Sequence, residues 1–118
     1  MTSSAITEPM VATISPKQLV EVLSKPNAHL IDVREHHEWD SGHLDGSRSV
    51  PLDDLRANPE RELPQDAVLV FVCAKGVRSL TAAKLADRLG YPAVYSVDGG
   101  TAACARAGIP LVAARAAA

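Results

Sequence analysis

The stretch VLVFVCAKGVRSLTAAKLADRLG, residues 68–90, contains the two clearest elements of the sequence. Its first five residues are all apolar and three of them are valine, which is typical of a strand buried on both faces of a parallel sheet. From Ser79 to about Leu89, apolar residues recur at helical spacing, and Gly90 is placed to end that helix. The residues on this apolar stripe are Ala82, Leu85, Ala86 and Leu89. The stretch therefore predicts a strand, a loop and a helix in succession.

Segments on both sides of this stretch repeat the alternation of strand and helix. Further strands are expected at 10–13, 30–33 and 93–97, and further helices at 16–25, 51–55 and 102–107, with a short polar helix or loop at 35–43. The helix at 16–25 has the clearest start, because the Ser15 hydroxyl can cap it and Pro16 suits its first turn. The alternation predicts an α/β domain with a mostly parallel sheet.

Length and composition exclude several classes of protein. The chain has 118 residues, a net charge of −2 and 47% hydrophobic residues, which fits one domain with its own core. The near-neutral charge argues against binding to nucleic acids or anionic membranes, and no apolar run approaches the roughly 18 residues of a membrane span. The two cysteines are too few for a disulfide scaffold or a zinc site. We therefore expect a cytoplasmic protein with a loose N-terminus at 1–9, a domain at 10–112 and an alanine-rich tail at 113–118.

The loop CAKGVRS, residues 73–79, lies where ligands bind in parallel sheets, beyond the carboxyl end of a strand. We expect Cys73 to be a reactive thiolate there. The following helix directs its free N–H groups at the loop, and Gly76 allows successive amides to converge on one point. Lys75 and Arg78 add positive charge, and such surroundings lower the pKa of a thiol. The alternative is that Cys73 is a small, buried apolar residue that ends a strand.

Four segments of the chain form an ordered set of motifs. They are LIDVRE at 30–35, EWDSGHLDGSRSVP at 38–51, CAKGVRS at 73–79, and VDGG at 97–100 followed by AGIP at 107–110. In this order they resemble the single-domain rhodaneses, a sulfurtransferase family. The resemblance covers about residues 10–111 and implies a rhodanese-like three-layer sandwich, with a mostly parallel central sheet and helices on both faces. The chain departs from the family pattern at Thr101 and Cys104, where an aromatic residue and a tryptophan are usual, so we expect a looser and wetter pocket.

The resemblance implies a thiosulfate sulfurtransferase that works through a persulfide on Cys73. The donor is thiosulfate or a related small anion, and the acceptor is cyanide or a thiol, which can belong to a small molecule or to a protein. The residues implied in binding the donor are Ala74, Lys75, Gly76, Val77, Arg78 and Ser79. Of these, Lys75 and Arg78 would hold the sulfonate end. No metal or organic cofactor is implied, because sulfur is both the nucleophile and the group transferred.

Two other functions are left open. A module that relays sulfur between proteins would have the same loop, so the sequence separates it poorly from a thiosulfate sulfurtransferase. A phosphatase or arsenate reductase is disfavoured, because four residues separate Cys73 from Arg78, one fewer than in the loops of those enzymes. By resemblance, the shorter loop suits sulfur chemistry.

Several residues outside the loop have more than one interpretation. Asp32 and Arg34 either brace the catalytic loop or form an ordinary ion pair at the end of a strand. Cys104 is either a buried apolar residue or a resolving partner that forms a disulfide with Cys73. The histidines within 36–43 lack a convincing spacing for a metal site, so we expect them to be structural.

Overall fold

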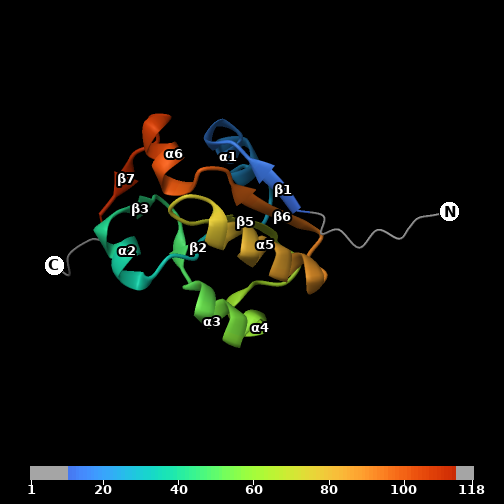
Figure 1. Ribbon diagram of the computed structural model, residues 1–118. Helices are drawn as coiled ribbons and strands as arrows, with labels where there is room; N and C mark the ends of the chain where they lie inside the picture. The colour runs from blue at the N-terminus through green and yellow to red at the C-terminus, as the bar shows by residue number, and fades with distance from the viewer. Residues whose placement is uncertain (1–10, 114–118) are drawn as a thin grey trace.

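The computed structural model describes residues 11–113, which form a central sheet of five strands (Figure 1). The strands lie in the order β1-β6-β5-β2-β4, and every pairing between them is parallel. Their bounds are β1 (Val11–Ile14), β2 (Ala28–Asp32), β4 (Arg48–Ser49), β5 (Val68–Val72) and β6 (Ala93–Val97). A separate antiparallel pair consists of β3 (His43–Leu44) and β7 (Leu111–Val112). The predicted α/β class with a mostly parallel sheet is confirmed.

Helices cover both faces of the central sheet. They are α1 (Pro16–Leu23), α2 (His36–Ser41), α3 (Leu52–Ala57), α4 (Pro59–Glu62), α5 (Val77–Arg88) and α6 (Gly100–Arg106). Buried residues of α3 and α5 pack in one hydrophobic cluster, whereas those of α1 and α6 pack in a second. Figure 1 shows the same division, with α1 and α6 on one side of the sheet and α3 and α5 on the other. These are the three layers that the resemblance implied.

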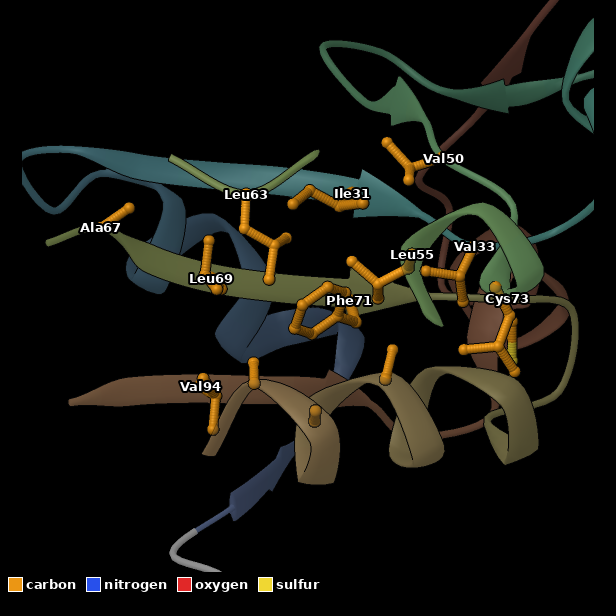
Figure 2. Close-up of a cluster of buried hydrophobic side chains, with 14 residues drawn as sticks. Ile31, Val33, Val50, Leu55, Leu63, Ala67, Leu69, Phe71, Cys73 and Val94 are labelled. Carbon is orange, nitrogen blue, oxygen red and sulfur yellow. The ribbon is translucent and has the colours of Figure 1, made fainter. Parts of the chain in front are cut away.

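Strand β5 lies in the middle of the sheet and supplies side chains to both clusters. Leu69 and Phe71 pack in the cluster under α3 and α5, which Figure 2 shows in close-up. Val70 and Val72 alternate with them and pack in the cluster under α1 and α6. The prediction that this apolar run is a strand buried on both faces is therefore confirmed, and Cys73 follows directly at its carboxyl end.

Helix α1 begins as the sequence predicted. The Ser15 hydroxyl accepts a hydrogen bond from the Gln18 N–H at 3.3 Å, and the Gln18 side chain accepts one from the Ser15 N–H at 2.8 Å. This reciprocal cap satisfies two backbone donors, and Pro16 occupies the first turn, where its missing N–H costs nothing. The helix ends at Leu23, shortly before the expected boundary at Pro26.

Helix α5 differs from its prediction at both ends. It begins at Val77 rather than Ser79, because Gly76 adopts a φ of +103° and serves as the N-cap. Leu89, which we expected on the buried stripe, is 48% exposed just after the helix ends. The buried positions on α5 are Ser79, Ala82, Ala83 and Ala86. These small side chains let the helix axis lie close to the sheet.

Four short elements were not predicted: β3, β4, β7 and α4. A strand of two residues has no alternation to detect, and α4 has only four residues. Helix α6 also begins earlier than expected, at Gly100 rather than residue 102. The expected loose segment at 1–9, the residue Met10 and all but the first residue of the expected tail lie outside the described residues. Among the helices of residues 11–113, none is long and apolar enough to cross a membrane.

Candidate active site

Cys73 lies between the carboxyl end of β5 and the first turn of α5 (Figure 2). The residue is only 1% exposed, but its sulfur faces backbone donors as well as packed hydrocarbon. The Gly76 N–H donates to the Cys73 Sγ at 3.1 Å, and the Ser79 N–H donates to it at 3.3 Å. The positive φ of Gly76 turns the chain so that these two N–H groups converge. The loop therefore directs two backbone N–H groups at the sulfur, in line with the converging amides that the sequence predicted.

The hydrogen bonds outweigh the effect of burial on the ionisation of Cys73. Burial of the sulfur raises the pKa of the thiol, because a charge is poorly solvated there. The Ser79 hydroxyl, whose Oγ lies 3.5 Å from the sulfur, and the N–H groups of the loop lower it by more. The pKa of the Cys73 thiol is therefore lower than its ordinary value. The sulfur has the surroundings of a nucleophile rather than those of an inert core cysteine.

The two cations of the loop are in different situations. The Arg78 guanidinium forms a two-point ion pair with Glu38 of α2, with N–O distances of 2.8 and 3.2 Å. The hydrogen bonds from Arg78 are the largest effect on the Glu38 carboxyl, and its pKa falls to about 2 although burial opposes the change. The charge of Arg78 is thus largely balanced. Lys75 is exposed and has no ion pair within residues 11–113.

Asp32 and Arg34 form a buried pair near the site. The Arg34 guanidinium donates to both Asp32 carboxylate oxygens at 2.9–3.1 Å, and also to the Gly42 carbonyl at 2.7 Å. These bonds fix the two ends of the segment that carries α2. Between the described side chains of this pair and the loop 73–79 there is no direct hydrogen bond. The pair holds the segment that presents Glu38, the partner of Arg78.

Sequence reasoning missed how closely the turn before α6 packs against the loop 73–79. The Thr101 N–H donates to the Cys73 carbonyl at 2.8 Å, and the Ala102 N–H donates to the Ala74 carbonyl at 3.2 Å. Gly100 has a φ of +62°, and a Cβ atom at this position would lie 2.2 Å from the Cys73 carbonyl oxygen. Only glycine allows this contact. The Gly99–Gly100 pair was visible in the sequence, but the surface it approaches was not.

The residues that depart from the family pattern are both packed. Thr101 and Cys104 are 5% and 0% exposed, so their own side chains are closely packed. The looser and wetter pocket that we expected stays a prediction. Cys104 lies in the cluster under α1 and α6, whereas Cys73 lies in the cluster on the other face of the sheet. Both thiols are free. Cys104 is therefore a buried apolar residue, and a disulfide with Cys73 does not fit this arrangement.

The histidines of 36–43 have ordinary partners in the structure. His36 contacts the Ser49 hydroxyl at 2.7 Å. The His43 ring stacks on Trp39 with a centroid distance of 3.6 Å, and its Nδ1 contacts the Trp39 carbonyl at 2.9 Å. Across the part of the chain that the structure describes, no group of three or more His, Cys, Asp or Glu residues is placed to hold a metal ion.

Comparison with known proteins gives one consistent family. The family model described as the rhodanese-like domain matches residues 15–107. The chain is 32% identical over 90 residues to the thiosulfate sulfurtransferase GlpE of Shewanella oneidensis, an alignment that covers 76% of this chain and 88% of that protein. It is 35% identical over 97 residues to the probable adenylyltransferase/sulfurtransferase MoeZ of Mycobacterium tuberculosis, covering 80% of this chain but only 25% of that protein.

Solved structures agree with this result. The rhodanese-related protein of Thermoplasma volcanium superposes with a TM-score of 0.76 at 29% identity, covering 86% of this chain and 97% of that one. Other relatives carry different names, among them a tRNA uridine(34) hydroxylase of Erwinia tasmaniensis at 30% identity, of which the chain spans 29%. The resemblance drawn from the motifs is confirmed: the chain belongs to the rhodanese-like domain family of sulfurtransferases.

Proposed function

We propose that the protein moves sulfane sulfur from thiosulfate, or a related donor, to a thiol or cyanide through a persulfide on Cys73. The observation that carries this proposal is the convergence of two backbone N–H groups and one hydroxyl on the buried sulfur. These donors stabilise the thiolate before the reaction and the negative charge of the persulfide after it. The likeness to GlpE, a thiosulfate sulfurtransferase by name, supports the choice of donor.

The reaction would proceed in two displacements at sulfur. The Cys73 thiolate attacks the outer sulfur of thiosulfate, and the old S–S bond breaks as sulfite leaves with its electron pair. A new S–S bond joins that sulfur to Cys73. In the second step, cyanide or an acceptor thiolate attacks the outer sulfur, and the electron pair of the broken bond returns to Cys73. The thiolate is regenerated, so the cycle needs no metal or organic cofactor.

The proposal divides the loop residues by what each contributes. The backbone of Ala74–Ser79 supplies N–H donors, and Val77, which is 75% exposed, borders the entrance. Lys75 is the exposed cation that would meet the sulfonate of thiosulfate. Arg78 would hold the sulfonate with the N–H groups that its ion pair with Glu38 does not use. We place the transfer in the cytoplasm, where a reducing environment keeps the thiol free.

A relay of sulfur between proteins is the second candidate. The exposed Val77 beside the loop offers an apolar contact for a partner, and the chain resembles a quarter of a larger protein with an adenylyltransferase/sulfurtransferase name. Phosphate or arsenate chemistry is less well supported, because only four residues separate Cys73 from Arg78, one fewer than in the loops of those enzymes. A persulfide on Cys73 is common to the first two functions and absent from the third.

Mass spectrometry of the intact protein tests the proposal. After incubation with thiosulfate, the native chain should gain the mass of one sulfur atom, and cyanide should remove it. The Cys73→Ser variant should gain nothing, whereas Cys104→Ser should gain sulfur as the native chain does. The proposal is wrong if the native chain gains no sulfur from thiosulfate or from a persulfide donor, or if Cys73→Ser still does.

Acceptor kinetics then separate the two candidates. A thiosulfate sulfurtransferase should turn over with cyanide or a small dithiol as acceptor. A relay module should load sulfur but discharge it slowly to these small acceptors. Replacing Arg78 by alanine should weaken turnover with thiosulfate more than with an uncharged persulfide donor. An equal loss with both donors would show that Arg78 shapes the loop and does not bind the anion.

A further inference from the structure

Two buried hydroxyls, those of Ser79 and Ser96, lie in a row beside the sulfur of Cys73. The Ser79 Oγ lies 3.5 Å from the Cys73 Sγ, and the Ser96 Oγ lies 2.8 Å from the Ser79 Oγ. Ser79 is on the first turns of α5 and Ser96 is on β6, so the groups come from separate elements. Ser79 is 0% exposed and Ser96 is 2% exposed. Buried hydroxyls need hydrogen-bond partners, and these two are partners of each other.

The ionised sulfur fixes the direction of these hydrogen bonds. A thiolate has only lone pairs, so the single proton of the Ser79 hydroxyl must point at the Cys73 Sγ. The Ser79 oxygen can then only accept from Ser96, which makes Ser96 the donor. When the sulfur is protonated, the chain can run in the opposite direction, from Cys73 through Ser79 to Ser96. Both the thiolate and the thiol therefore make a hydrogen bond with Ser79, but the bond does not stabilise the two states equally.

The contact favours the thiolate because hydrogen bonds to a charged group are stronger than those between neutral groups. A hydroxyl that accepts a hydrogen bond also becomes a better donor, since successive bonds polarise one another. Removing Ser96 would leave the Ser79 hydroxyl free to rotate away from the sulfur and would weaken the bond it donates. The thiol state would lose less, because its bonds carry no charge.

We propose that Ser96 is a positioning residue for Cys73: its hydroxyl holds the Ser79 hydroxyl in the orientation that donates to the thiolate. Ser96 does not touch the sulfur or any reacting atom. The inference rests on the proposed function only in taking Cys73 as the nucleophile. It concerns the ionisation of the thiol, which can be measured without any sulfur transfer.

Other charged groups around the loop are left unchanged by substitution of Ser96. They are Lys75 of the loop, Arg78 of α5 with its partner Glu38 of α2, the Asp32–Arg34 pair after β2, and Lys84 and Asp98 beside Ser96. Ser96, Lys84 and Asp98 line a cavity of about 360 Å³. Threonine keeps the hydroxyl of serine and adds one methyl group, and valine has a methyl group in place of that hydroxyl, so the two form a matched pair at position 96.

The experiment measures the rate of alkylation of Cys73 by iodoacetamide as a function of pH, read at the peptide level by mass spectrometry. Ser96→Ala should slow alkylation about fivefold at pH values below the thiol pKa, the equivalent of one hydrogen bond. The rates should converge at high pH, where the thiol is ionised in both proteins. Cys104 serves as the internal reference, because it becomes reactive only if the variant unfolds.

Three further variants keep the result interpretable. Ser96→Thr should behave as the native chain and Ser96→Val as Ser96→Ala, and this matched pair decides the question if the alanine variant does not fold. In a Ser79→Ala background, Ser96→Ala should have no further effect, because it acts through Ser79. Ser47→Ala removes another buried hydroxyl, one that accepts from Trp39, and should leave alkylation of Cys73 unchanged.

The pH profile decides between positioning and a merely structural role. An equal slowing at every pH would assign to Ser96 a role in access to the sulfur and overturn the inference. Native alkylation rates in both Ser96→Ala and Ser96→Val would overturn it as well, as would an undiminished effect of Ser96→Ala without the Ser79 hydroxyl. Loss of sulfur loading with an unchanged alkylation profile would instead count against the proposed function.

Discussion

Cys73 and Cys104 are two cysteines that are equally buried but have different neighbours. Both are almost completely buried, at the two faces of one sheet. Burial alone acts on Cys104 and raises the pKa of its thiol. Burial acts on Cys73 as well, but hydrogen bonds from Ser79 and the loop N–H groups more than reverse it. Donors aimed at the sulfur, and not exposure, therefore separate the cysteine whose pKa is lowered from the cysteine whose pKa is raised.

The largest effect should come from removing the close contact behind Cys73. Gly100→Ala places a Cβ atom 2.2 Å from the Cys73 carbonyl oxygen, at a φ of +62°. The loop must move, so we expect a loss of at least about 3 kcal/mol in the free energy of unfolding. Sulfur loading of Cys73 should fall more than tenfold. Urea unfolding and intact-mass spectrometry measure the two effects.

Gly90→Ala is the matched control for this substitution. Gly90 also has a positive φ, of +95°, but a Cβ atom there meets nothing within 4 Å. Gly90→Ala should lower the free energy of unfolding by about 1 kcal/mol, because only the backbone conformation is strained, and should leave sulfur loading unchanged. Equal losses in the two variants would mean that the contact with the Cys73 carbonyl does not hold the loop in place.

The second prediction concerns the pH at which each cysteine reacts. Because its pKa is lowered, Cys73 should be alkylated by iodoacetamide at neutral pH, whereas Cys104 should react only after unfolding. The sign for stability follows from linkage. The lowered pKa of Cys73 stabilises the folded protein fully above the ordinary thiol pKa, and this contribution is lost as the pH falls through the lowered value. The stability difference between the native chain and Cys73→Ala should therefore increase with pH.

The third prediction tests the balance of charge beside Cys73. Glu38→Gln should lower the free energy of unfolding by about 1 kcal/mol at pH 7, because the partly exposed ion pair with Arg78 is lost. The contribution of Glu38 is complete above its ordinary pKa of 4.5 and is lost as the pH falls to about 2. Urea unfolding of the two proteins should converge over this range. A difference that does not shrink as the pH falls from 4.5 towards 2 would contradict an ion-pair origin.

The same variant should also change the choice of donor. With its carboxylate partner gone, Arg78 presents a full positive charge, so kcat/KM for thiosulfate should rise relative to that for an uncharged persulfide donor. Glu60→Gln serves as the control, because it removes an equal charge from an exposed residue that is not the partner of Arg78. A similar rise in both variants would mean that the overall charge of the protein is responsible.

The smallest effect should come from Cys104. Cys104→Ala deletes one buried sulfur atom and should cost about 1 kcal/mol, the usual result of a small cavity. Sulfur loading and the alkylation profile of Cys73 should not change. Loss of loading in this variant would contradict the separation of the two thiols by the sheet.

The sequence predicted the parts of the fold whose pattern is local. The apolar run of β5, the cap at Ser15 and the strand β6 are each visible within a few residues. The two-residue strands and the exposed position of Leu89 depend on tertiary packing, which no local period records.

The contacts of the candidate site also divide into those that local sequence predicts and those that depend on distant residues. The loop around Cys73 could be predicted because its donors lie within six residues of the sulfur. The pairing of Arg78 with Glu38 joins positions 40 residues apart, and Ser96 approaches Ser79 from another strand. A serine within an apolar strand carries no local sign of the hydroxyl it will meet. The burial of Ser96 depends on the packing of α5 against β6, which only the folded structure shows.

The depth of Cys73 has a consequence for how the protein meets other thiols. Because Cys73 is only 1% exposed, a bulky partner cannot approach its bare sulfur closely. A persulfide extends the side chain by one S–S bond, about 2 Å, which can bring the terminal atom to the rim of the loop. Exposure and sulfur loading would then be linked: small reagents can reach the bare thiolate, whereas a large acceptor would meet only the terminal sulfur of the proposed persulfide.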